Sequence, residues 1–141
     1  MKLLIVDDLE EYVDSIEFMA EDYFEKIYKA TSLVDAKKIC ADMVPDTAII
    51  DIRLSEDDET NKDGLLLLEW MKEQGFHTKV IMISAYKDFD YAVEALNAGA
   101  EYFLKKPVKN AELKETLEKI NQGGSFRENR PPGPPVKAFN Y

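Results

Sequence analysis

Polar side chains that could bind a cation or an anion stand directly after four short apolar runs of the chain. They are Asp7 and Asp8, then Asp51, then Ser84, and finally Lys106, which precedes Pro107. Three carboxylates brought together repel one another, and each tends to hold a proton unless a cation lies among them. Oxygen ligands that leave room for several waters suit Mg²⁺ or Mn²⁺ better than zinc. These residue types predict a divalent-cation site with a lysine beside it, if the fold joins the four runs.

The elements that must position these residues follow from an alternation of apolar and amphipathic segments. The expected strands are Lys2–Val6, Lys26–Ala30, Thr47–Ile50, Lys79–Ile83 and Tyr102–Lys105. The expected helices are Tyr12–Tyr23, Val34–Met43, Gly64–Lys72, Phe89–Ala98 and Ala111–Ile120. Strands that are apolar on both sides and separated by helices predict an α/β fold with a parallel sheet covered on both faces. Ligands bind at the carboxyl ends of such strands, where the polar residues stand.

Helix boundaries have their own signals in the sequence. Ser32 with an acidic residue three positions later, Asp88, and Asn110 with Glu112 in the first turn are expected at helix starts. Gly99 is expected to end the fourth helix. The composition changes at residue 123 to GGSFRENRPPGPPVKAFNY, which favours an extended polyproline conformation. We therefore expect one domain over residues 1–122 and a Pro-rich tail or linker over 123–141.

Composition excludes several classes of protein. Hydrophobic residues make up 45% and charged residues 33% of the chain, as in ordinary globular proteins. The net charge of −10 repels phosphate backbones, so we expect no direct nucleic-acid binding by this domain. The first apolar run is too short for a signal-peptide core, so we expect a cytoplasmic protein without membrane contact. The single cysteine, Cys40, allows no internal disulfide and is expected to be buried, whereas the single histidine, His77, is expected at the surface.

Several segments resemble the receiver domains of two-component response regulators. They are LIVDD (4–8), IIDIRL (49–54), the Asp63-Gly64 pair, MISAY (82–86) and AVEALNAGAEYFLKKPV (92–108), and together they cover about residues 1–121. The resemblance implies a flavodoxin-like, doubly wound (βα)5 fold with strand order 2-1-3-4-5. It also implies a phosphorylation switch rather than an enzyme that turns over a separate substrate.

The resemblance assigns a role to each residue of the predicted site. Asp51 would accept a phosphoryl group from the phosphohistidine of a sensor histidine kinase or of a phosphotransfer protein. Asp8 would ligate Mg²⁺ directly, Asp7 mostly through water, and Arg53 through its backbone carbonyl. Lys106 would pair with a phosphoryl oxygen. A carboxylate is a competent nucleophile, and phosphoryl transfer needs mainly positioning and charge neutralisation, so the chemistry agrees.

Other positions would carry the response to phosphorylation. Ser84 would turn its hydroxyl toward the phosphoryl group, and Phe103 would rotate inward from a partly exposed position. The surface of the fourth helix, fifth strand and fifth helix would then change, to control an output domain or partner, with homodimerisation as one such output. Lys105 should point away from the site, because neighbouring residues of a strand face opposite sides. The bond between Lys106 and Pro107 is expected to be cis, as in the family.

Two departures from the family pattern lie after Asp51. The stretch from Asp51 to Gly64 is longer than usual by about five residues, and Ser55 replaces the expected proline. Gly64 itself is expected, together with the small Ala85, to leave space near the phosphate. The extra residues include Glu56, Asp57, Asp58 and Glu59, which predict a solvated loop near enough to affect metal affinity or kinase choice.

The lifetime of the phosphoryl group depends on the side chains two positions after Asp51 and after Ser84. These are Arg53 and Tyr86, which are bulky and cannot orient an attacking water as a carboxylate or amide would. We expect a phosphorylated state that lives longer than in chemotaxis-type regulators built for rapid reset, unless both side chains point to solvent and have no effect.

Three other kinds of protein share part of this pattern. A flavodoxin shares the strand order, but Asp7 and Asp8 would repel the flavin phosphate. A phosphatase that forms an aspartyl phosphate would need a second acid where this chain has Arg53. A receiver that only docks partners would usually lack Asp8, Asp51 or Lys106, and all three are present.

Overall fold

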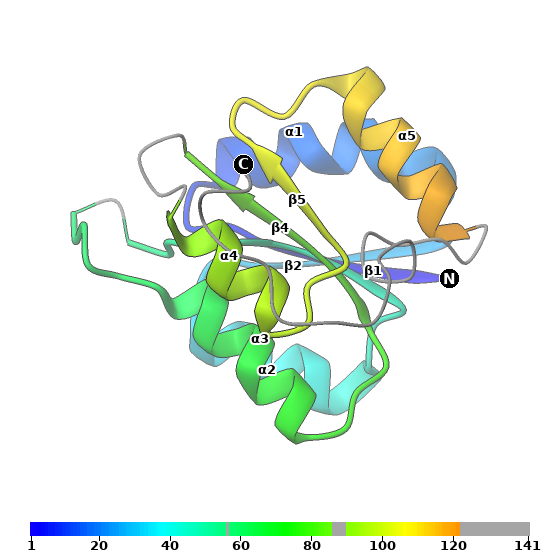
Figure 1. Cartoon of the computed structure of the whole chain (residues 1–141). Helices are drawn as coiled ribbons and strands as arrows, with labels where there is room; N and C mark the ends of the chain where they lie inside the picture. The colour runs from blue at the N-terminus through cyan, green and yellow to red at the C-terminus, as the bar shows by residue number, and fades with distance from the viewer. Residues whose placement is uncertain (56, 86–89, 122–141) are drawn as a thin grey trace.

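The computed structural model describes residues 1–55, 57–85 and 90–121, and within them strands and helices alternate (Figure 1). The strands are β1 Lys2–Val6, β2 Lys26–Ala30, β3 Thr47–Asp51, β4 Lys79–Ser84 and β5 Tyr102–Lys105. The α-helices are α1 Glu10–Ala20, α2 Leu33–Met43, α3 Asp63–Glu73, α4 Asp90–Asn97 and α5 Asn110–Asn121. The predicted strand and helix pairs are confirmed, and one element differs by more than a residue from its predicted bounds. α1 starts and ends earlier than expected, and a short 3-10 helix covers Glu21–Tyr23.

The strands form one parallel sheet in the order β2-β1-β3-β4-β5, which confirms the predicted fold class. Its register brings the polar strand ends together. Val6 pairs with Ile50 across β1 and β3, so the residues that follow them, Asp7 and Asp51, come side by side. Ser84 pairs with Lys105 across β4 and β5, directly before Lys106.

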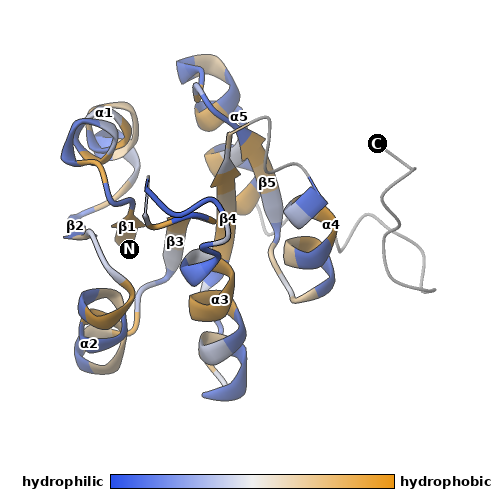
Figure 2. Ribbon diagram, turned by 90° about the vertical axis from the view of Figure 1, so that its left-hand side faces the viewer, coloured by the Kyte–Doolittle hydropathy of each residue, from blue (hydrophilic) through white to orange (hydrophobic). Residues whose placement is uncertain are grey.

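Alternate residues of each strand face two separate apolar cores. One core joins Leu3, Ile5, Ile49, Ile81 and Ile83 to residues of α1 and α5. The other joins Leu4, Val6, Ala48, Ile50, Val80 and Met82 to residues of α2, α3 and α4. Figure 2, seen from the edge where the strands end, shows helices on both faces of a largely apolar sheet. Each fully buried aliphatic side chain contributes about 1.5–3 kcal/mol, so the two cores hold the sheet rigid beneath its polar edge.

Local signals explain several element boundaries. The Ser32 hydroxyl accepts a hydrogen bond from the Asp35 amide at 3.2 Å, which confirms the predicted cap of α2. Gly99 has a positive φ of 114°, and the amide of Ala100 donates to the carbonyl of Ala95, so a glycine-dependent turn ends α4 as predicted. α5 begins at Asn110 itself. The predicted cap Asp88 and the tail 123–141 lie outside the described residues.

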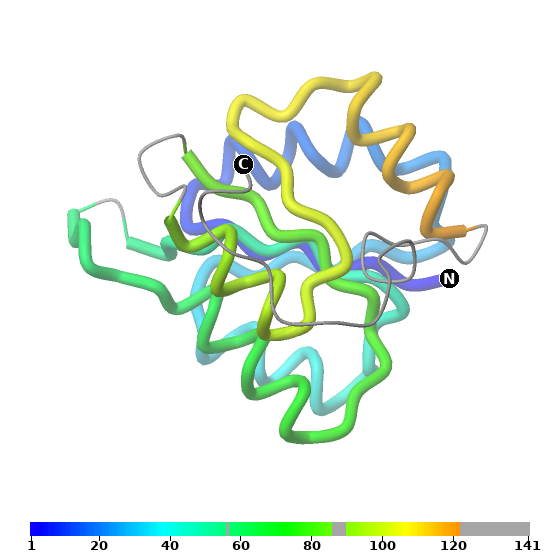
Figure 3. Tube along the Cα trace, viewed as in Figure 1, coloured from blue at the N-terminus to red at the C-terminus, as the bar shows by residue number. Residues whose placement is uncertain are grey.

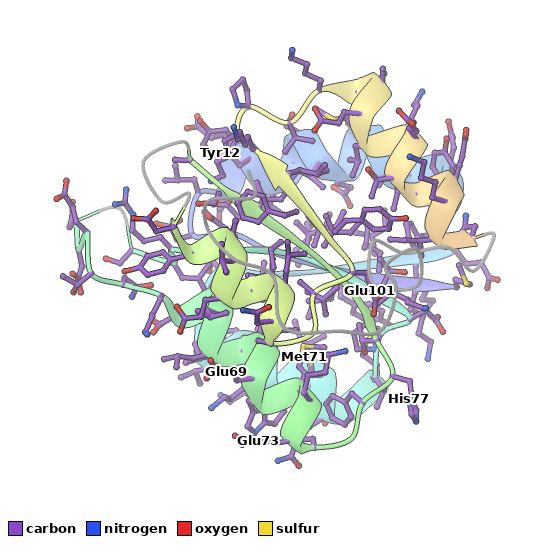
Figure 4. All side chains as sticks on the ribbon, in the orientation of Figure 1. Tyr12, Glu69, Met71, Glu73, His77 and Glu101 are labelled. Atoms are coloured by element: carbon purple, nitrogen blue, oxygen red, sulfur yellow. The ribbon has the colours of Figure 1, made fainter. Side chains whose placement is uncertain are left out.

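Two isolated reactive side chains lie away from the polar edge. Cys40 is fully buried, and burial raises the pKa of its thiol to about 11. His77 is exposed in the turn before β4, at the opposite end of the sheet from the strand ends (Figure 4). Both agree with the sequence expectation. Among the described residues, the helices are too short or too polar to cross a membrane.

Candidate functional site

Three carboxylates converge at the carboxyl edge of the sheet. Asp7 and Asp8 follow β1 and Asp51 ends β3, and one carboxylate oxygen of each lies within 4.8 Å of the others. Asp7 is 1% exposed and Asp51 is 5% exposed. Since β1 and β3 are neighbours, the sheet itself forces this convergence, which the sequence predicted from strand ends alone.

Lys106 lies among these carboxylates. The Lys106 Nζ atom is 2.7 Å from Asp51 Oδ2 and 2.9 Å from Asp7 Oδ2. Its backbone amide donates to the Ser84 carbonyl at 2.9 Å, which ties the end of β5 to the end of β4. The peptide bond to Pro107 is cis, as expected. Lys105 is exposed, and Lys106 is thus the lysine that reaches the carboxylates.

Burial dominates the electrostatics of Asp51. It raises the pKa of this carboxyl to about 7, although the neighbouring Lys106 and the backbone N–H of Arg53 act in the opposite direction. Burial would lower the pKa of Lys106, but Asp51 and Asp7 outweigh it and the pKa lies above its ordinary value. Among the described residues of the site, three carboxyl groups thus lie near one ammonium, which is in contact with two of them, so a further cation would be attracted there.

The donor atoms suit a hard divalent ion. Carboxylate oxygens are the ligands that Mg²⁺ and Mn²⁺ take, and the three aspartates offer one each within a short span. Asp7 Oδ2 has its ion pair with Lys106 but no hydrogen bond within the described residues. The residues present therefore fit a bound Mg²⁺.

The two predicted switch residues lie on β4 and β5. Ser84 is fully buried at the end of β4, and its hydroxyl donates to the carbonyl of Ala85 at 3.1 Å. Phe103 in β5 is half-buried against the core that faces α2, α3 and α4. The movements expected of the Ser84 and Phe103 side chains would start from these positions.

Arg53 is buried rather than pointing to solvent, with 8% exposure. Its Nη1 atom has no hydrogen-bond partner among the described residues. Hydrogen bonds from Thr60 lower the pKa of Asp58, and the charge of Arg53 adds to that effect. Tyr86, the other residue assigned to phosphoryl lifetime, lies outside the described residues.

The long acidic loop between β3 and α3 has internal order. The Asn61 side-chain oxygen accepts from the amides of Leu54 at 2.9 Å and Asp63 at 3.0 Å, which closes the base of the loop. The trace in Figure 3 shows this segment extending away from the rest of the domain. Asp57, Asp58 and Glu59 are exposed, as expected, and Glu56 lies outside the described residues. The role of Asn61 was not predicted, because hydrogen bonds that close an irregular loop leave no periodic pattern in the sequence.

Gly64 lets the start of α3 pack directly on the end of β3. Its amide donates to the Ile52 carbonyl at 2.8 Å, and a Cβ at this position would run into the carbonyl oxygen of Asp51. This packing role was not predicted, and the expectation that Gly64 leaves space near a phosphate stays a prediction.

Tyr12 is the neighbour of the site that sequence reasoning missed. The Lys106 Nζ atom lies 4.3 Å from the centroid of its ring. Figure 4 shows Tyr12 on α1 at the end of the molecule where the strands finish. The available signal was its position four residues after Asp8, which is about one helical turn.

Comparison with known proteins agrees with this geometry. The family model of the response regulator receiver domain matches residues 3–118. The chemotaxis protein CheY of Listeria monocytogenes is 33% identical over 120 residues, which cover 84% of this chain and 97% of CheY. The response regulator protein PilR of Pseudomonas aeruginosa is 32% identical over 116 residues, which cover 82% of this chain and 25% of PilR. The chain thus spans about a quarter of the length of PilR, and it spans 24% of the alginate regulator AlgB.

Solved structures lead to the same family. The receiver domain of NtrX from Brucella abortus superposes with a TM-score of 0.75 at 28% identity, covering 85% of this chain and 98% of that one. A CheY-like receiver domain protein from Methanospirillum hungatei gives a TM-score of 0.72 at 28% identity, covering 87% and 98%. The family model spans most of the chain, and the fold and the acidic edge agree with it. This chain belongs to the response regulator receiver domains of two-component signalling systems.

Proposed function

We propose that this chain is a signalling switch that receives a phosphoryl group on Asp51 from a sensor histidine kinase or a phosphotransfer protein. The observation that carries the proposal is the buried Asp51 carboxylate, 2.7 Å from Lys106 and grouped with the oxygens of Asp7 and Asp8. A phosphoacceptor needs a nucleophile, a cation site and a mobile ammonium in one place. The domain is then a substrate and a signal carrier, not an enzyme that turns over a separate substrate.

The transfer makes one bond and breaks another. An oxygen of Asp51 attacks phosphorus, and the bond from phosphorus to the donor imidazole breaks with its electron pair left on nitrogen. Bound by Asp7, Asp8, Asp51 and the Arg53 backbone carbonyl, Mg²⁺ or Mn²⁺ would supply positive charge to the phosphoryl oxygens. Lys106 exchanges its contact with Asp51 Oδ2 for one with a phosphoryl oxygen.

The same event moves the switch residues. The Ser84 hydroxyl leaves the Ala85 carbonyl for the phosphoryl group, and Phe103 rotates inward behind it. The surface formed by α4, β5 and α5 changes as a result. A second copy of the domain or another partner then binds the changed surface. We assign residues 1–122 to the receiver and 123–141 to a tail or linker, and place the domain in the cytoplasm with its kinase.

Mass spectrometry of the intact protein tests the proposal. Treatment with acetyl phosphate and Mg²⁺ should add one phosphoryl group to the wild type and none to Asp51→Asn, because the amide is nearly isosteric but a poor nucleophile. Asp46→Asn, at the other end of β3, is the matched control and should be phosphorylated normally. Persistent addition of one group to Asp51→Asn, in folded protein, would place the acceptor elsewhere.

A further inference from the structure

The Tyr12 ring lies against the ammonium group of Lys106. Its ring centroid lies 4.3 Å from Lys106 Nζ, a distance at which a cation is attracted to the negative face of an aromatic ring. The Lys106 side chain is only 12% exposed, whereas Tyr12 is 37% exposed. The lysine therefore has carboxylates on one side and an aromatic ring on another.

We propose that Tyr12 is a positioning residue for Lys106, whose ring face holds the ammonium while it moves from Asp51 to a phosphoryl oxygen. This inference rests on the proposed phosphorylation of Asp51. The contacts of Lys106 with Asp51 and Asp7 are directional and the first of them must break on phosphorylation. Attraction to a ring face has no such fixed direction, so it persists over a shift of the ammonium.

A carboxylate of the site helps to set the place of the ring. Asp7 Oδ1 accepts a hydrogen bond from the Leu9 amide at 3.0 Å, and the Leu9 carbonyl accepts one from the Tyr12 amide at 3.0 Å. The next residue, Val13, is 2% exposed in the core that α1 shares with α5. The first turn of α1 is thereby tied to Asp7 and to the sheet, and the Tyr12 backbone has little freedom to move away.

Three substitutions separate the ring face from other effects. Tyr12→Phe keeps the ring, Tyr12→Leu keeps an apolar cover without a π face, and Phe18→Leu removes another exposed aromatic side chain of α1 as the control. We expect phosphorylation by acetyl phosphate at saturating Mg²⁺ to slow by about threefold to tenfold in Tyr12→Leu. Tyr12→Phe and Phe18→Leu should keep the wild-type rate.

A second measurement needs no phosphorylation. In lysine-labelled protein without a phosphoryl donor, the Lys106 methylene protons next to Nζ should be shifted upfield by the ring current in wild type and in Tyr12→Phe. The shift should vanish in Tyr12→Leu, while circular dichroism shows that the variant is folded.

The outcomes are distinguishable. A wild-type rate in folded Tyr12→Leu, a slow rate in Tyr12→Phe, or unshifted Lys106 signals in the wild type would each overturn the role of Tyr12. A wild type that takes no phosphoryl group would instead overturn the proposed function and the positioning role that rests on it. The Lys106 signals would then still show whether the ring holds the ammonium.

Discussion

Asp46 and Asp51 lie at opposite ends of β3, and their surroundings differ in kind. Asp46 precedes the strand, where its carboxylate accepts from the Lys2 amide at 2.7 Å and its carbonyl accepts from the Lys79 amide at 2.9 Å. Asp51 closes the strand beside Asp7, with the Lys106 ammonium at 2.7 Å. Backbone groups hold the first aspartate, whereas ionised side chains surround the second.

This contrast separates a structural aspartate from a reactive one. Hydrogen bonds from fixed amides satisfy Asp46 and join the starts of β1, β3 and β4, so the residue stabilises the sheet. At the other end, burial raises the pKa of Asp51 to about 7, and two more carboxylates lie close by. A group that is buried without enough positive partners favours a ligand that brings positive charge.

The largest effect should come from glycines at the two ends of α3. Gly64→Ala places a methyl group against the Asp51 carbonyl and should lower the free energy of unfolding by about 2–4 kcal/mol. Gly75→Ala, at a φ of 79° with open space around it, should cost only about 1–2 kcal/mol. Urea unfolding followed by the fluorescence of Trp70 would measure both. Equal losses would show that the packing of α3 on β3 is not tight at Asp51.

The next largest effect should be on metal binding, which we expect at the carboxyl end of β3 and not at Asp46. Asp8→Ala removes a proposed direct ligand, and Mg²⁺ affinity should fall by about 100-fold, since even residues that only support ligands cost about 10- to 100-fold. Asp46→Ala should bind Mg²⁺ as the wild type does. Isothermal titration calorimetry, or an NMR titration where binding is weak, would compare them. Unchanged affinity in Asp8→Ala would remove that residue from the site.

The raised pKa of Asp51 predicts a pH dependence of both stability and metal binding. Because the folded-state pKa is raised above the unfolded value, the folded protein without metal loses stability as pH rises from about 4 to about 7. Mg²⁺ competes with the same proton, so its affinity should be about tenfold weaker at pH 6 than at pH 8. Asp51→Asn should lose this dependence in both unfolding and titration experiments. A pH-independent affinity in the wild type would contradict the raised pKa.

The smallest expected effect concerns phosphoryl lifetime. Arg53 is buried near Asp51, so replacing it by Asn together with Tyr86→Glu should open a path for an oriented water and speed phosphate loss several-fold at fixed Mg²⁺. His77→Asn, at the amino end of β4, should change nothing. The decay of the phosphorylated species can be followed by intact mass. An unchanged or slower decay in the double variant would contradict the shielding role.

The success of sequence reasoning differs between the elements and the site. Apolar alternation predicted every strand within one residue, because buried parallel strands leave little room for polar side chains. The end of α1 was placed too late, since the aromatic Tyr23 continues the apolar pattern through the 3-10 helix Glu21–Tyr23. The acidic loop was predicted as solvated, but its closure by Asn61 was missed, because a side chain that accepts from two amides at the ends of an irregular loop leaves no periodic signal.

The sequence alone determined which residues stand at the strand ends and that their charges do not balance. It did so because side-chain type and strand length are local properties of the chain. Tertiary structure decided which atoms meet: Lys106 with Asp51 and Asp7, the Tyr12 ring over the ammonium, and the Ser84 hydroxyl toward the Ala85 carbonyl. The contacts of Lys106 join residues far apart in the chain. Their distances depend on strand register and helix packing, which act only once the whole sheet is assembled.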